Sequence, residues 1–175
     1  MEELFKHNKM FEKCHIEETR NEFVIAENEG TVSYLPDPEN NIQGLKISNP
    51  ESALSFLAFD YCYADGLQDY SGKRCDCLLF ADRKLLFVEL KMNITSQRRT
   101  TETLREGREQ LSNTINYFYI YFKCNFNSLQ RFAIVSIPTS FYPRSPARLS
   151  KIKKEFYDAN YQVDYIEKNE FSFSG

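Results

Sequence analysis

Two short apolar segments joined by a polar turn constrain this chain more than any other feature. They occupy residues 75–80 and 85–91, and residues 81–84 between them include Asp82 and no large apolar side chain. This composition is typical of a β-hairpin. If residues 80 and 85 flank the turn, the pairing places Asp76 directly opposite Glu89.

The far end of this hairpin carries three charged groups. Carboxylates placed opposite each other on paired strands lie about 4.5–5.5 Å apart and destabilise the sheet unless something compensates for their charge. Lys91 is two residues beyond Glu89, so the alternation of a strand places its ammonium group on the same face as Asp76 and Glu89. Two carboxylates beside one cation are hard oxygen donors that suit Mg²⁺ or Mn²⁺.

The order of Asp76 followed by Glu89-Leu90-Lys91 resembles the motif of the PD-(D/E)XK nuclease superfamily, which has the restriction-endonuclease-like fold. The resemblance covers roughly residues 50–138, and Cys75 stands where the family usually has proline. It implies that Asp76 and Glu89 hold Mg²⁺ or Mn²⁺, with help from the backbone carbonyl of Leu90. It also implies that Lys91 orients or activates the attacking water.

An alternative interpretation of the same residues is an exposed sheet end without chemistry. Asp76 and Glu89 would then be solvated, and Lys91 or Arg74 would neutralise them. Surface ion pairs of this kind are common and contribute little to stability.

The fold that we expect is α/β, with an αβββαβ core in which helices flank a central mixed sheet. Alternation places one set of apolar residues on the acidic face of the hairpin (Leu78, Phe80, Leu85 and Phe87) and another set on the opposite face (Leu79, Leu86, Val88 and Leu90). A sheet that is apolar on both faces predicts helices on both sides. The sequence predicts only a weak strand, around residues 67–70, before the one that carries Asp76.

The 175 residues fit one domain in three parts. Residues 1–49 are expected to decorate the core with a helix over 2–13 and a hairpin of strands 23–27 and 31–35. Residues 50–138 form the core, with a helix over about 102–122 and a strand over 131–138. Residues 139–175 form a C-terminal extension, with a helix over 145–160 and a strand over 161–166.

The first core helix is expected to begin near Asn49, which is a suitable N-cap, with Pro50 in its first turn. Leu54, Leu57 and Ala58 follow at helical spacing. The resemblance implies that Glu51, on this helix, completes the metal site. An ordinary first-turn glutamate that complements the helix dipole explains Glu51 equally well.

Four arginines cluster near the start of the predicted helix 102–122: Arg98, Arg99, Arg105 and Arg108. They are candidates for contacts with nucleic-acid phosphates beside Lys91, although a solvated basic face balanced by nearby glutamates is an equal alternative. Gln110 resembles a glutamine of recombination-type relatives, with Thr114 where a tyrosine would stand. It is a candidate nucleic-acid contact or an ordinary helix-surface residue.

Charge and cysteine content exclude some classes of protein. A net charge of −3 does not attract nucleic acid as a whole, so binding must depend on local patches. The five cysteines are scattered, which argues against a disulfide framework and against structural zinc. Neither a signal-peptide-like start nor a membrane-spanning segment is evident, so we expect a cytoplasmic protein without a membrane partner.

The sequence therefore predicts a Mg²⁺- or Mn²⁺-dependent nuclease that hydrolyses nucleic-acid phosphodiester bonds, with DNA favoured over RNA. Such a small chain is expected to need a homodimer or a partner protein for targeting. Small nucleases of this type suggest a role in bacterial restriction or phage defence. The alternative, from another class of function, is a catalytically silent member of the same fold that binds protein or nucleic acid.

Overall fold

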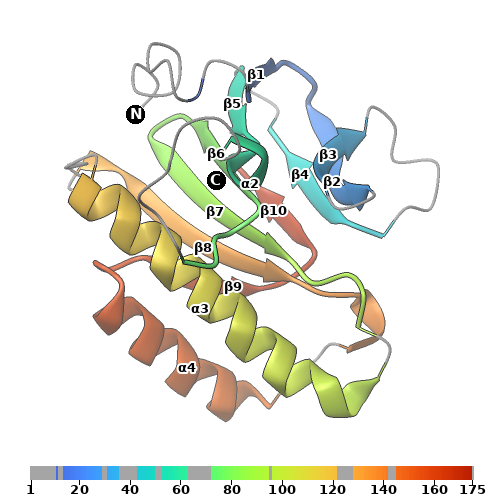
Figure 1. The fold of residues 1–175 in the computed structure, drawn as a ribbon, viewed down its shortest axis with the longest axis vertical. Helices are drawn as coiled ribbons and strands as arrows, with labels where there is room; N and C mark the ends of the chain where they lie inside the picture. Colours follow the sequence, from blue (N-terminus) through green and yellow to red (C-terminus); the bar gives the residue numbers. More distant parts are fainter. Residues whose placement is uncertain are drawn as a thin grey trace.

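A six-stranded mixed sheet carries the predicted hairpin at its centre (Figure 1). The computed structural model describes residues 11, 14–28, 31–35, 43–49, 53–62, 72–94, 96–121, 128–141 and 145–174. In spatial order the strands are β1 (His15–Glu18), β5 (Leu54–Leu57), β6 (Cys77–Ala81), β7 (Lys84–Leu90), β8 (Gln130–Ser136) and β9 (Asp164–Glu167). The pairs β7–β8 and β8–β9 are parallel and the others are antiparallel.

The hairpin of β6 and β7 has the predicted register. Leu78 pairs with Phe87 and Phe80 pairs with Leu85. The loop is shorter than expected, because only Asp82 and Arg83 lie outside the paired strands. Both have positive φ, 47° and 64°, as two-residue hairpin turns of type I′ require.

Two long helices cover the acidic face of the sheet. They are α3 (Gln97–Tyr121) and α4 (Pro146–Ala159), and Figure 1 shows α3 crossing the strands. Leu78, Leu85 and Phe87 pack in one core cluster with Leu111 and Phe118 of α3. The faces assigned by alternation are confirmed, because Leu79, Leu86, Val88 and Leu90 belong to a separate cluster on the opposite side.

A second sheet, and not the predicted helices, covers that opposite face. Its strand order is β10 (Glu170–Ser172), β4 (Leu45–Ser48), β2 (Glu22–Asn28) and β3 (Thr31–Leu35). Phe23 and Ile25 of β2 and Leu45 and Ile47 of β4 alternate toward the core, where they pack against the larger sheet. The predicted N-terminal hairpin is confirmed as β2–β3, but it is half of a packing layer and not a decoration.

The predicted helix after Asn49 is wrong. Residues 54–57 form β5, which pairs with β6, and the only helix of this described segment is the short α2 (Phe59–Cys62). All four residues of β5 are buried: Leu57 packs on the helix side, and Leu54 and Phe56 pack on the side of the second sheet. A short apolar run that is buried on both faces lacks the alternation that identifies a strand.

Other boundaries differ in smaller ways. Helix α3 begins five residues before the predicted position, while β8 and α4 lie where the sequence placed them. Strand β9 begins only at Asp164, since Tyr161 and Gln162 form a turn with positive φ. Strands β1, β4 and β10 were not predicted. The predicted helix 2–13, except for Phe11, and the weak strand at 67–70 lie outside the described residues.

Cys14 is disulfide-bonded, which the scattered cysteine spacing did not predict. Cys75 and Cys77 are free and buried. Within the described ranges, no helix is both long enough and apolar enough to cross a membrane.

Helix α3 approaches the sheet most closely at Gly107. A Cβ atom at this position would lie 3.0 Å from both γ-carbons of Val135 and 3.4 Å from Cγ of Glu89. Both neighbours are fully buried. The absence of a side chain therefore sets how near α3 lies to the charged end of β7.

We expect Gly107→Ala to destabilise the protein by about 1–3 kcal/mol, because a methyl group would overpack against Val135. Thermal or urea unfolding measures this effect. At an exposed position within a helix, Gly→Ala would instead stabilise the protein, by roughly 0.5–1 kcal/mol. Glu109→Ala, on the exposed side of α3, is the control; a Gly107→Ala protein more stable than the parent would contradict this close approach.

Candidate active site

Asp76 is held opposite the end of β7 by its own backbone and side chain. Its N–H donates to the carbonyl of Val88 (3.0 Å), and its carbonyl accepts from the N–H of Asp60 (3.1 Å). The Oδ2 atom accepts a 2.5 Å hydrogen bond from the N–H of Leu90. These contacts place the carboxylate at the end of the β6–β7 hairpin. The paired register ends at Cys77 and Val88, so the predicted direct pairing of Asp76 with Glu89 is not part of it.

Glu89 and Lys91 form a close ion pair beside Asp76. Nζ of Lys91 lies 2.6 Å from Oε1 of Glu89, and the side chains are 22% and 1% exposed, respectively. Asp76 is also buried, with 9% exposure. The alternative of two solvated carboxylates at an open sheet end is therefore wrong. Arg74 is the other cation proposed for that alternative, and its Nε lies 3.3 Å from Oδ1 of Asp60.

Gln110 connects this ion pair to the segment before β6. Its Oε1 accepts from Nζ of Lys91 (2.8 Å), and its Nε2 donates to the carbonyl of Arg74 (2.9 Å). One turn later, Oγ1 of the buried Thr114 accepts from the N–H of Cys75 (2.9 Å) and donates to the carbonyl of Gln110 (3.1 Å). Helix α3 thus fixes Lys91 and the approach to Asp76 together.

The two carboxylates make the interior negative around the neighbouring cysteines. Burial raises the pKa of the Cys75 thiol well above its usual range, and the nearby charges of Glu89 and Asp76 raise it further. Burial and the charge of Asp76 act in the same direction on the pKa of Cys77. Both thiols therefore stay protonated and are core groups.

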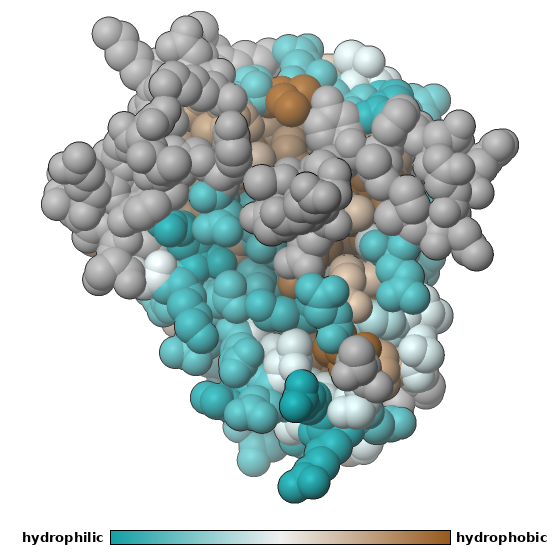
Figure 2. Space-filling model, turned by 45° about the vertical axis from the view of Figure 1, so that its right-hand side comes forward, coloured by the Kyte–Doolittle hydropathy of each residue, from teal (hydrophilic) through white to brown (hydrophobic). Residues whose placement is uncertain are grey.

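The predicted arginine cluster separates into two groups. Arg98, Arg99 and Arg105 are exposed on α3, which begins at the strongly hydrophilic lower end of the molecule in Figure 2. Arg108 instead turns inward, with Nη1 3.5 Å from Glu167 and its guanidinium 5.8 Å from the centre of the Tyr165 ring. Arg108 is thus an internal partner of β9, in contrast to the phosphate contact that the sequence suggested.

Glu167 is a buried carboxylate that the sequence analysis missed. It pairs with Val135, which in turn pairs with Glu89, so two glutamates lie in one row across three strands. Tyr165 donates a 3.0 Å hydrogen bond from its hydroxyl to Oε1 of Glu167. Burial, followed by the charge of Glu167, raises the pKa of Tyr165 well above its usual range. Extending the alternation of Val163 and Tyr165 by one more step would have found Glu167.

A cavity of about 250 Å³ opens beside the ion pair. It is lined by Leu90, Lys91, Asn93, Ile94, Arg99 and Thr103. Lys91, whose ammonium group contacts Glu89, therefore lines the same space as the exposed Arg99, whereas Asp76 and Glu89 are not among its lining residues. This arrangement can accommodate an anionic group such as a phosphate.

The donor set can be compared with what a divalent ion requires. In the described part of the chain, no group of three or more His, Cys, Asp or Glu side chains could hold a metal. Glu51, the predicted third ligand, lies outside the described residues. Mg²⁺ is nevertheless usually bound through one or two carboxylates together with waters and substrate oxygens, and each carboxylate can accept several contacts. Asp76 and Glu89 fit that pattern.

Comparison with protein-family models, with curated proteins and with solved structures finds no match to this chain. The resemblance to PD-(D/E)XK nucleases therefore depends on Asp76, Glu89 and Lys91 and on where the fold places them.

The Glu89–Lys91 contact predicts a coupling that unfolding experiments can measure. Lys91→Met leaves a buried carboxylate without its cation and should cost about 2 kcal/mol, less than the ~3–5 kcal/mol of a fully buried pair because Lys91 is partly exposed. Glu89→Gln in the same chain should recover about half of that loss. Lys154→Met, which breaks the exposed pair with Asp158, is the control and should change stability little. Additive effects of the two site mutations would contradict the coupling.

Proposed function

We propose that this protein is a metal-dependent nuclease that hydrolyses phosphodiester bonds in nucleic acid, with DNA as the favoured substrate. The observation that carries the proposal is the position of Lys91. Its ammonium group contacts Gln110 and the buried Glu89, and Lys91 also lines a cavity beside the junction that holds Asp76. A partly exposed cation held between fixed acceptors is preorganised to stabilise negative charge that develops on a phosphate.

The roles of the residues follow from these positions. Asp76 and Glu89 would hold the Mg²⁺ or Mn²⁺ ion, and the carbonyl of Leu90 is the further ligand that the superfamily resemblance implies. When bound, such an ion supplies a Lewis acid and lowers the pKa of water. Lys91 would orient the attacking water and neutralise charge on the phosphate. Gln110 would keep the ammonium group of Lys91 in place.

A nucleic-acid substrate agrees with the charges near the cavity. Arg99 lines the cavity with Lys91, and Arg98 and Arg105 are exposed on the same helix. Glu102 and Glu109 are exposed on the same helix, so these arginines are proposed as individual phosphate contacts and not as a continuous basic surface. Phosphate contacts of this kind position a strand without reading its sequence. We therefore propose that a homodimer or a partner protein supplies targeting, and restriction or phage defence is the role that this combination suggests.

Cleavage assays test the proposal directly. Purified protein is incubated with linear, circular and single-stranded DNA and with RNA, in the presence of EDTA, Mg²⁺ or Mn²⁺. We expect metal-dependent cleavage that falls about 100-fold or more in Lys91→Ala, because a preorganised charge at the phosphate is lost. Asp76→Asn and Glu89→Gln should abolish cleavage, because each removes a proposed metal ligand.

Lys154→Ala is the matched control, since it removes an exposed lysine that does not line the cavity and should cleave like the parent. Folding of every variant is checked by circular dichroism. Absence of cleavage on all four substrates with folded protein would contradict the proposal and favour the non-catalytic binding module. Cleavage that persists in Lys91→Ala would contradict the assignment of this site.

Gln110 should affect turnover through Lys91. We expect Gln110→Leu to lower kcat about 10- to 100-fold with little change in KM, because the ammonium group loses an acceptor that fixes its position. Asn113→Leu is a close control, since Asn113 on the same helix donates to the carbonyl of Lys73 (3.3 Å) and does not contact Lys91 in the described structure. Equal losses in the two variants would assign Gln110 a purely structural role.

A further inference from the structure

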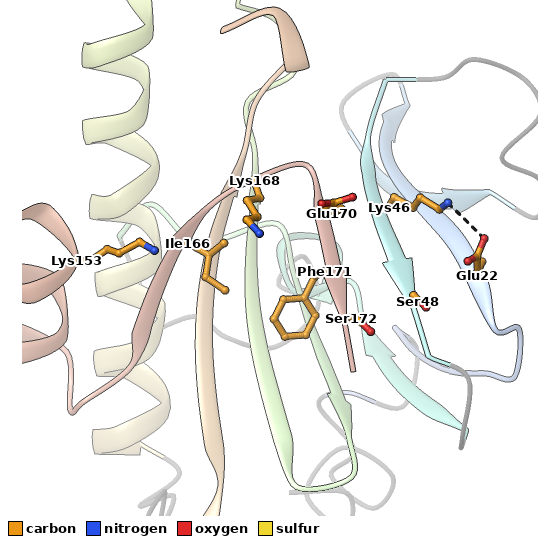
Figure 3. A pocket seen from close by; sticks show the side chains of 9 residues that line it. All are labelled: Glu22, Lys46, Ser48, Lys153, Ile166, Lys168, Glu170, Phe171 and Ser172. Atoms are coloured by element: carbon orange, nitrogen blue, oxygen red, sulfur yellow. Dashed lines mark ion pairs between the residues drawn. The ribbon is translucent and has the colours of Figure 1, made fainter. Parts of the chain in front are cut away.

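A second and larger cavity, of about 550 Å³, lies at the β9 edge of the larger sheet, beside the β10 edge of the second sheet (Figure 3). Its wall is built from β2, β4, β9, the turn between β9 and β10, β10 and one side chain of α4. The lining residues are Glu22, Lys46, Ser48, Lys153, Ile166, Lys168, Glu170, Phe171 and Ser172. None of them lines the cavity beside Lys91, so the two spaces are separate sites.

Apolar side chains form the floor of this second cavity. Ile166 lies on β9 and packs at the border of the core cluster between the two sheets. The ring of Phe171 projects from β10 toward Ile166 and Lys168 in Figure 3. Its contacts with Phe132 and Phe173 are T-shaped, with ring centres 5.2 Å and 5.1 Å apart, so the orientation of the ring is fixed. A rigid aromatic ring at an open cavity is a surface on which a flat group can stack.

Three lysines surround this floor, and they differ in whether a carboxylate pairs with them. Lys46 lies 3.4 Å from Glu22, but neither Lys153 nor Lys168 has an ion-pair partner among the described residues. The contrast on α4 is informative, because the neighbouring Lys151 and Lys154 pair with Glu155 and Asp158. Lys153 instead points toward Ile166 and the cavity (Figure 3).

We infer that this cavity binds a nucleotide unit, with its base against Phe171 and Ile166 and its phosphate held by Lys153 and Lys168. The volume lies within the roughly 300–1,000 Å³ of typical ligand sites. An aromatic ring with adjacent cations is the combination that binds nucleotides without sequence preference. The proposal goes beyond the nuclease function and does not depend on it.

The acidic residues of the cavity orient the ligand. Glu170 and Glu22 repel phosphate, so the phosphate lies on the side of Lys153 and Lys168. Glu170 and the hydroxyl groups of Ser48 and Ser172 are acceptors for the amino and hydroxyl groups of a base or sugar. The unit can be a free nucleotide or one residue of a strand, since both present the same ring and phosphate.

Calorimetric titration with EDTA present tests the inference. The probes are AMP, adenosine, inorganic phosphate and a short single-stranded oligonucleotide. We expect AMP to bind more tightly than adenosine or phosphate, and its affinity to fall about fivefold or more in Lys153→Ala and in Lys168→Ala, each of which loses one charge-assisted contact. Phe171→Leu should weaken AMP binding and leave phosphate binding unchanged.

Lys154→Ala, one residue along α4 and paired with Asp158, is the matched control and should bind AMP like the parent. Lys91→Ala should also retain AMP binding, which separates this cavity from the proposed active site. Oligonucleotide binding that is lost in the same variants would identify a strand as the source of the nucleotide. The inference is overturned if AMP and oligonucleotide both fail to bind, if adenosine or phosphate binds as tightly as AMP, or if the lysine variants leave AMP binding unchanged.

Discussion

The buried carboxylate of Glu89 is the constraint on which the arrangement around it depends. At 1% exposure, its charge is removed from water, and such burial is unfavourable unless a cation and hydrogen bonds compensate. Lys91 supplies the cation, and Gln110 fixes Lys91 from α3. Gly107 lets the same helix reach Glu89 and Val135 without a clash. The position of α3 and the contact between Glu89 and Lys91 therefore support each other.

The two acidic positions are supported by different means. Asp76 accepts from the backbone of Leu90 within the hairpin, so its position follows from the register of β6 and β7. Glu89 depends on side chains from a helix that is distant in sequence. Helix α3 also reaches the segment just before Asp76, since Thr114 accepts from the N–H of Cys75 and Gln110 donates to the carbonyl of Arg74. Local sequence reasoning located the hairpin end but did not foresee these contacts from a distant helix.

What the sequence could predict follows the range of the interactions involved. The hairpin register and the alternation of its faces are local, and both are confirmed for Leu78 and Phe87. Strand β5 was mistaken for a helix because its four residues are buried on both faces and show no alternation. The second sheet depends on pairing between β4 and β10, which are more than a hundred residues apart and carry no local signal of each other.

The fold decides which charged groups near the candidate site face inward and which stay exposed. Glu89 pairs with Lys91 and Glu167 pairs with Arg108, so each buried carboxylate takes one cation with it and the remaining groups still sum to −3. Arg98, Arg99 and Arg105 stay exposed on the helix that carries Arg108. Net charge counts every group equally, whereas a polyanion approaching within a Debye length, about 8 Å at physiological salt, senses mainly the nearest exposed charges. The distribution of charge, and not its sum, decides whether the start of α3 attracts phosphate.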